Sequence, residues 1–257
     1  MKKTIYKNCP LLEVILQIKF PTILSINSNE PDKFQEKIRT EFPIYSLGIE
    51  NEQEISFQPM NNGIFPSLTN SQQHKNYSFI SEDGGYKINL TSSFISISTI
   101  NYYSWERLLE KFNKPLEAFV EIYKPSFFER IGLRYIDVFS REKLNLHKEP
   151  WKNLINPHLL GNLNVIEEEL VVNSSVDFEY FLDNKISRAK IHAGIGKING
   201  EIENSFIIDS DFIHINNEKI DDFERIANYL HLNAKNFLNE AICKKLHNAL
   251  EPEEKDE

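Results

Sequence analysis

Cysteine is scarce in this sequence, and motifs for a cofactor or a metal are missing. The 257 residues include only Cys9 and Cys243, at opposite ends of the chain and in no CxxC pair. This excludes a disulfide framework and a thiolate zinc site. The seven histidines show no HxH or HExxH spacing, no GxSxG occurs, and the one GxG, at 194–196, falls inside an expected strand. We therefore expect no cofactor, no metal and no assembled catalytic motif.

Long hydrophobic runs are also missing. No stretch approaches the roughly 18 uncharged apolar residues that a membrane-spanning helix needs. The first residues include two lysines, but Glu13, Gln17 and Lys19 interrupt the apolar run and no small-residue cleavage site follows, so a secretion signal is not expected. Together with the low cysteine content, this predicts a cytoplasmic protein without a membrane partner.

The charge balance is acidic, while the overall composition is that of a globular protein. Lys and Arg number 29 against 38 Asp and Glu, which gives a formal net charge of −9. Such a balance works against non-specific binding to nucleic acid, so a nucleic-acid partner is not favoured. Part of the charge lies in the last seven residues, EPEEKDE, which offer no apolar side chain to bury. We expect 251–257 to be a disordered acidic tail.

Apolar periodicity divides the chain into short strands and two long helices. Alternating patterns predict strands, and residues 59–76, rich in Asn, Gly, Pro and Ser, predict a long loop. Stripes at helical spacing predict helices over 31–42, 104–123 and 221–250, the second beginning at Ser104 as N-cap. The expected strands are 11–20, 55–58, 77–81, 86–90, 94–100, 127–139, 163–172, 176–182, 187–198, 201–208 and 212–215, with 187–198 and 201–208 joined by a two-residue turn at 199–200.

The order of these elements repeats along the chain. Each half has a strand, a short helix, several antiparallel strands and then one long amphipathic helix. This predicts an α+β fold of two similar halves, 1–140 and 141–250, each an antiparallel curved sheet packed on one long helix. The halves share no residue-level identity, so the duplication rests on the pattern alone. The core should bury Trp105, Phe112, Phe119, Phe237 and Leu238.

The strand at 127–139 carries the candidate binding site. Its alternation puts Arg130, Gly132 and Arg134 on one face. Two guanidinium groups suit a carboxylate or a phosphate, and the glycine between them leaves room for a ligand or a backbone to approach. Glu13 and Gln17, on the polar face of the first strand, would extend this patch if the two strands are neighbours.

A structural interpretation of the same residues competes with the binding site. The two arginines would then pair with carboxylates of the chain itself, with Glu13, Glu129 or Asp137 as candidates. In the same way, the polar face of the first strand would be an ordinary solvent-exposed face.

Three segments resemble one known family. They are CPLLEVILQ at 9–17, the SEDG turn at 81–84 with Tyr103 and Trp105 beyond it, and RIGLRYID at 130–137. They resemble a sporadically distributed bacterial family of similar length with PLxEVxxQ and RIGLRYIN signatures. The resemblance covers nearly the whole chain, includes His231 followed by Phe237, and departs at Asp137, where Asn is commoner. It implies no particular activity, but the patchy distribution resembles that of phage-defence or toxin–antitoxin genes and so implies a partner encoded by a neighbouring gene.

The sequence favours binding over catalysis. We predict a non-catalytic binding protein that recognises a protein partner or a small anionic ligand, as a component of a phage-defence or toxin–antitoxin system. The alternative is an enzyme that acts on nucleic acid or a nucleotide. The absence of an assembled acid–base or metal motif distinguishes the two and favours the first.

Overall fold

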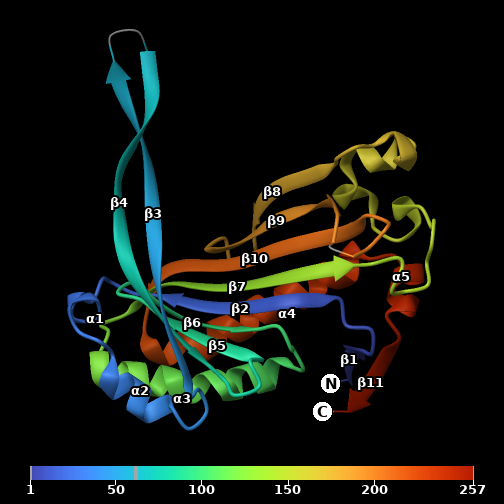
Figure 1. Ribbon diagram of the computed structural model, residues 1–257. Helices are drawn as coiled ribbons and strands as arrows, with labels where there is room; N and C mark the ends of the chain where they lie inside the picture. The colour runs from blue at the N-terminus through green and yellow to red at the C-terminus, as the bar shows by residue number, and fades with distance from the viewer. Residues whose placement is uncertain (1, 61–62, 199, 257) are drawn as a thin grey trace.

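The fold is α+β and is built around one large antiparallel sheet (Figure 1). The computed structural model describes residues 2–60, 63–198 and 200–256. Within these ranges nine strands form the main sheet in the order β3-β4-β5-β6-β2-β7-β10-β9-β8, and β1 pairs with β11 in a second, two-stranded sheet. The strands are β1 (Lys2–Tyr6), β2 (Leu11–Lys19), β3 (Ile44–Met60), β4 (Gly63–Ile80), β5 (Tyr86–Leu90), β6 (Phe94–Thr99), β7 (Phe128–Phe139), β8 (Ser175–Phe181), β9 (Ser187–Gly196), β10 (Ser205–Glu218) and β11 (Pro252–Asp256).

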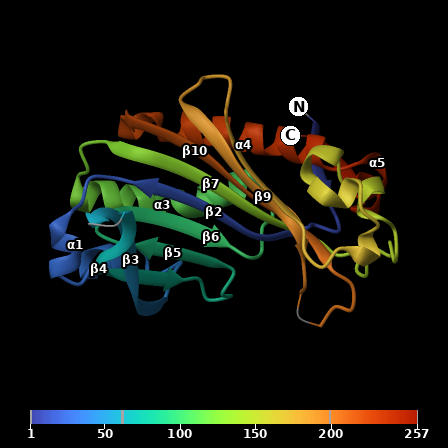
Figure 2. The same ribbon diagram turned by 90° about the horizontal axis from the view of Figure 1, so that it is seen from above.

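Both long helices pack on one face of this sheet and leave the other face open (Figures 1 and 2). Helix α3 packs on β6, and α4 packs on β7 and β10. The helices are α1 (Leu24–Ser28), α2 (Asp32–Ile38), α3 (Trp105–Tyr123), α4 (Phe223–Ala241) and α5 (Lys244–Ala249). Short 3-10 turns lie at Trp151–Asn153, Pro157–Leu159, Gly161–Asn164, Glu168–Leu170 and Ile220–Asp222. No helix in the described ranges is long and apolar enough to cross a membrane.

The alternating and helical patterns of the sequence explain this arrangement. In β2 the side chains of Val14, Leu16 and Ile18 are fully buried, so one face of the strand joins the core. Helix α3 begins where its cap predicts, because the Ser104 hydroxyl accepts a hydrogen bond from the Arg107 amide at 3.2 Å. Of the residues expected in the core, Trp105, Phe112, Phe119 and Phe237 are buried and Leu238 is partly buried.

The predicted halves share one sheet and do not have separate sheets. Strand β7, from the predicted N-terminal half, pairs with β2 on one side and with β10 of the predicted C-terminal half on the other. No gap in the sheet therefore marks a boundary near residue 140. The division into two similar halves stays a prediction.

Two segments expected to be irregular are strands. Most of the predicted loop at 59–76 belongs to β4, which pairs with β3 from Ile44↔Ile80 to Met60↔Gly63 and extends away from the rest of the sheet (Figure 1). The expected disordered tail is also wrong, because Pro252–Asp256 pairs with β1. Backbone hydrogen bonds need no apolar side chain, which is why composition did not reveal either pairing. The amides of Lys7 and Asn8 continue the second pairing by donating to the carbonyls of Glu251 and Leu250, each at 3.1 Å.

Three other expectations are corrected by local backbone geometry. Residues 163–172 are not a strand: they include the 3-10 turn Glu168–Leu170 and the end of the turn Gly161–Asn164, with Leu163 buried and Leu170 exposed. Strands β9 and β10 do pair, but 197–204 connect them, a longer loop than the two-residue turn expected at 199–200, whose Asn199 lies outside the described residues. The last long helix ends at Ala241, where extended Ile242 bridges to Ile155 and separates α4 from α5.

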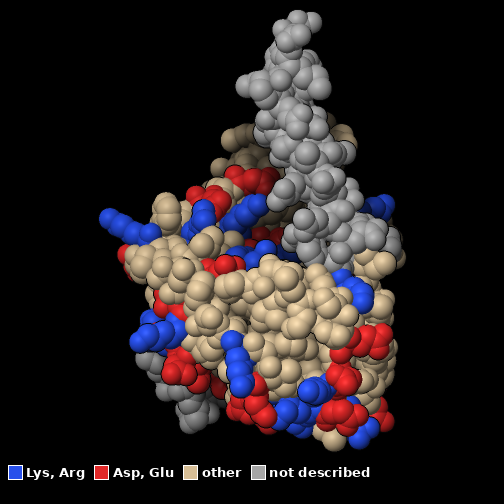
Figure 3. Space-filling model, turned by 90° about the vertical axis from the view of Figure 1, so that its left-hand side faces the viewer, with Lys and Arg blue, Asp and Glu red and all other residues tan. Residues whose placement is uncertain are grey.

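One side of the molecule has an uncharged area at its centre, with charged side chains around it. The centre of Figure 3 is a broad surface free of Lys, Arg, Asp and Glu, on the side where α1 and the base of the β3–β4 ribbon lie. Several exposed apolar side chains belong to these elements: Leu24, Ile44, Tyr45, Leu47 and Ile49.

Candidate functional site

Arg130, Gly132 and Arg134 were predicted on one face of β7, and they do share a face. That face is the open side of the sheet. Ile131, Leu133 and Tyr135 are buried against the helices, while the side chains of Arg130 and Arg134 are partly exposed on the other face. The expected neighbour strand is also correct, because β2 pairs with β7.

Both arginines are paired with carboxylates of the chain, but not with the expected ones. Arg130 donates to Gln17 Oε1 at 2.8 Å and to Asp211 Oδ2 at 2.9 Å. Arg134 holds Asp209 with two hydrogen bonds, at 2.7 and 2.5 Å. These acids come from β10, which the sequence did not identify as a neighbour.

Glu13 has a smaller part in this cluster. The pKa of Arg134 is raised first by its hydrogen bonds to Asp209, and Glu13 adds only a weak long-range attraction. The pKa of Asp211 is raised, because burial of its carboxyl outweighs the attraction of the two arginines. The cluster is therefore close to neutral by its own internal pairing.

Gly132 makes room for a protein side chain. A Cβ atom at this position would lie 2.6 Å from Nη1 of Arg130. The glycine thus lets the Arg130 guanidinium cross the strand toward Gln17 and Asp211. From the sequence, this space was predicted to leave room for a ligand or a backbone.

A small cavity adjoins the open-face cluster. Its volume is about 340 Å³, and six polar residues line it. Three are carboxylates, and one of these, Asp177, contacts His192 Nδ1 at 2.7 Å. An anion entering here would meet as many carboxylates as bases, so the anionic-ligand site at the arginines stays a prediction that this geometry does not favour. The lining residues are Arg134, Asp177, Lys190, His192, Asp209 and Asp211.

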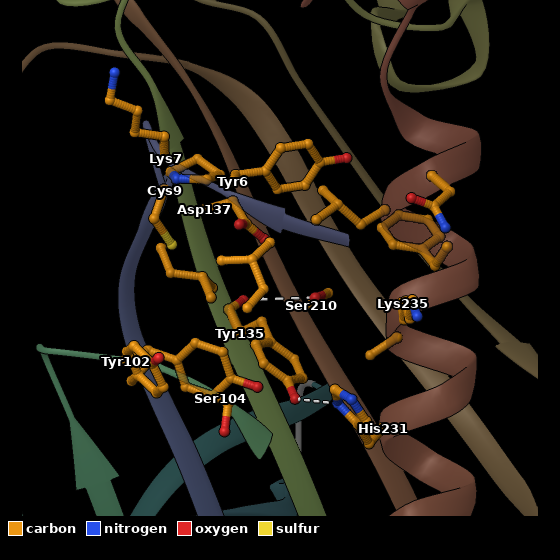
Figure 4. A pocket seen from close by; sticks show the side chains of 18 residues that line it. Tyr6, Lys7, Cys9, Tyr102, Ser104, Tyr135, Asp137, Ser210, His231 and Lys235 are labelled. Atoms are coloured by element: carbon orange, nitrogen blue, oxygen red, sulfur yellow. Dashed lines mark hydrogen bonds between the residues drawn. The ribbon is translucent and has the colours of Figure 1, made fainter. Parts of the chain in front are cut away.

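A second pocket, of about 390 Å³, lies on the helix-covered face (Figure 4). Strand β1, the segment at 7–11, β7, the start of α3 and helix α4 surround it. Its walls are mostly apolar and aromatic, as in many ligand pockets. The residues that line it include Tyr6, Cys9, Tyr102, Tyr135, Asp137, Ser210, His231, Lys235 and Leu238.

Asp137 is the unusual residue of this pocket. Its side chain is only 3% exposed, and Oδ1 has no hydrogen-bond partner among the residues described. Burial raises the pKa of this carboxyl to about 7, because the ionised form has lost its water. Strand alternation explains the position, since the residues that share the face of Tyr135 point toward the helices. The sequence analysis placed Asp137 only as a partner for the arginines, which lie on the opposite face.

Hydrogen bonds hold the aromatic walls of the pocket. The Tyr135 hydroxyl contacts His231 Nδ1 at 2.8 Å (Figure 4). The His231 ring stacks on Trp105 with centroids 4.6 Å apart. From β1, the Tyr6 hydroxyl contacts His247 Nδ1 at 2.9 Å. Burial raises the pKa values of Tyr102 and Tyr135, so both phenols are neutral. These contacts fix the walls before any ligand arrives.

The reactive groups near the pocket are not activated. Burial raises the pKa of the Cys9 thiol, which keeps it protonated and a poor nucleophile. No group of three or more His, Cys, Asp and Glu side chains in the described part of the chain is placed to hold a metal ion.

Comparison with known proteins adds no functional information. No protein-family model and no curated protein matches the sequence. The family resemblance stays a prediction, and the function has to be argued from the sites.

Proposed function

We propose that this protein is a binding protein that holds a small organic molecule in the pocket around Asp137. The observation that carries the proposal is the buried Oδ1 atom of Asp137, a pocket-lining residue, which has no hydrogen-bond partner within the described part of the chain. A buried polar atom without a hydrogen bond costs about 1–3 kcal/mol, and such atoms are rare in native folds. A ligand that donates a hydrogen bond to Oδ1 would recover that free energy.

The size and composition of the pocket support the same function. Its volume of about 390 Å³ falls within the roughly 300–1,000 Å³ of known ligand pockets. Apolar walls with a few polar groups give affinity through burial and orientation through hydrogen bonds.

Catalysis is the alternative, and one observation favours it. A carboxyl with a pKa of about 7 is suited to general acid or base work. However, the thiol and the phenols beside it are held in their protonated forms, and a lone carboxyl lacks a second reacting group. We therefore favour binding without turnover, and recovery of the bound molecule in unchanged form would support this choice.

A pair of leucines on α4 allows a matched test of the site. Leu238 lines the pocket, whereas Leu232 is 55% exposed and does not. Screening a fragment library by ligand-observed NMR should find molecules that bind wild type and Leu232→Trp but not Leu238→Trp, whose larger side chain fills the space. If no fragment binds wild type, or if the hits bind Leu238→Trp equally well, the pocket is not the site.

A protein partner is a second candidate function, supported by the edge strand β3. Residues 44–49, IYSLGI, contain no charge and no proline, although β3 ends the sheet and offers unpaired backbone groups. Most edge strands carry charges that prevent pairing, as Asp177 and Glu179 do on β8 at the other edge. We propose that an extended segment of a partner, encoded by a neighbouring gene of a defence or toxin–antitoxin locus, adds to this edge.

Co-expression with the neighbouring genes tests this second function. Leu47→Lys on β3 should abolish co-purification of the partner, and Leu12→Lys, at an exposed apolar position on β2, should not. A partner retained equally by Leu47→Lys would exclude the β3 edge.

A further inference from the structure

Every element around the pocket places titratable or polar side chains in its lining, together with Asp137. Strand β1 contributes Tyr6, and the segment that follows it contributes Lys7 and Cys9. Lys7 is turned away, because its Nζ pairs with Glu251 at 3.0 Å and its side chain is 66% exposed. Helix α4 contributes His231, which is engaged by Tyr135, and the exposed Lys235 at the rim. Strand β10 contributes Ser210, and the segment before α3 contributes Tyr102, Tyr103 and Ser104.

None of these groups compensates the Asp137 carboxylate. Burial raises its pKa, and among the described residues no cation or hydrogen-bond donor acts against this effect. The free protein therefore already bears the desolvation of this acid. A ligand that brings its own positive charge has only its own desolvation to overcome.

We propose that the ligand is an organic monocation, a protonated amine on an apolar or aromatic body, whose ammonium group contacts Asp137 Oδ1. The inference rests on the proposed function and names its ligand class. Tyr6, Tyr102 and Tyr135 supply neutral aromatic rings around this point (Figure 4), and such rings attract ammonium groups through their π faces. The apolar body would lie against Phe237 and Leu238 of α4.

Other ligand charges fit less well. An anion about 4 Å from the ionised carboxylate would be repelled by about 4 kcal/mol at an effective dielectric constant of about 20. A neutral ligand of the same shape can satisfy Oδ1 with one hydrogen bond but lacks the charge attraction. The expected order of affinity is therefore amine, then alcohol, then carboxylate.

Proton linkage gives this ligand class a distinctive signature. The amine binds the ionised carboxyl, which in the free protein exists fully only above about pH 7. The dissociation constant should therefore rise about tenfold for each pH unit below that value and level off above it, until the amine loses its own proton. His231 and His247 lie nearby, and the Asp137→Asn variant separates their contribution, because it removes only the carboxyl.

Calorimetric titration with matched probes tests the inference. The probes are benzylamine, benzyl alcohol and benzoate, with the corresponding naphthalene compounds as a larger series, each titrated into the full chain on both sides of neutral pH. We expect the amines to bind wild type and Leu232→Trp more than tenfold tighter than the alcohols at alkaline pH, and to weaken on acidification. In Asp137→Asn the preference for amines and the proton-linked change should both disappear, while its thermal melt shows a folded protein.

The outcomes separate the ligand class from the binding function. If alcohols or carboxylates bind wild type as tightly as the amines and fail to bind Leu238→Trp, this result refutes the cationic ligand class but supports the proposed binding function. Amines whose affinity does not change with pH, or is unchanged in Asp137→Asn, also overturn the contact with Asp137. If no probe or fragment binds the wild type, both the ligand class and the proposed binding function are refuted.

Discussion

Replacing Asp137 by Asn keeps the shape of this side chain and removes its charge, so it measures what the buried carboxyl costs the fold. In the folded protein the pKa is raised from 3.8 to about 7 by burial. A raised carboxyl pKa means that the folded state favours the neutral acid. The contribution of this carboxyl to the unfolding free energy is therefore greatest below its unfolded-state pKa and is lost as the pH rises from about 4 to about 7.

The size of the effect follows from the two pKa values. A difference of about 3 pH units corresponds to about 4 kcal/mol of unfolding free energy. Asparagine does not ionise. The unfolding free energy of the variant should therefore rise relative to that of wild type by about 1.4 kcal/mol for each pH unit across that interval. The buried amide of Asn can lower the unfolding free energy by about 1–3 kcal/mol at every pH, because its hydrogen bonds are not made. This shifts the difference between variant and wild type by a constant and does not change its slope against pH.

Urea unfolding followed by tryptophan fluorescence gives the required free energies, since Trp105 and Trp151 are both buried. We expect the difference between variant and wild type to grow steadily between about pH 4 and about pH 7 and to stay constant above. Asp183→Asn, at an exposed position between β8 and β9, is the control and should give a flat difference. A flat difference for Asp137→Asn as well would refute the claim that the carboxyl is buried without compensation.

Three further substitutions test the packing and the open face. Phe112→Ala removes a fully buried ring of α3 and should lower the unfolding free energy in urea by about 3–5 kcal/mol; a loss under about 1 kcal/mol would contradict its place in the core. Gly132→Ala should displace the Arg130 guanidinium, a flexible group, and lower stability by about 1 kcal/mol, with amine binding in the Asp137 pocket unchanged by calorimetry. Arg134→Ala breaks a half-exposed pair with Asp209 and should lower stability by no more than about 1 kcal/mol in a thermal melt, so a loss of pocket binding would show that the two faces are coupled.

Local patterns in the sequence were enough to predict the central elements. The stripe of α3 and its Ser104 cap, and the alternation in β2 and β7, depend on residues close together in the chain. Pairing between strands that are far apart in the chain does not depend on such local patterns. Arg134 and Asp209 are 75 residues apart, and nothing in the spacing of either strand indicates that β7 lies beside β10. For the same reason, the sequence indicated that the arginines could pair with carboxylates but not which carboxylates they pair with.

The Asp137 pocket shows how far strand alternation could have led. On β7, the alternation that sends Arg130 and Arg134 to the open face sends Asp137 to the covered face with Leu133 and Tyr135, so an acid at a core position was visible in the sequence. Whether such an acid is paired depends on what the rest of the chain brings to it. Here β1 brings Tyr6 and α4 brings the stacked His231, and among the described side chains no cation acts on the carboxyl. A protein that needed only stability would gain from Asn or an apolar residue at this position, because an uncompensated buried carboxylate lowers stability at neutral pH. The proposed cationic ligand would supply the positive charge that this carboxylate lacks in the free protein.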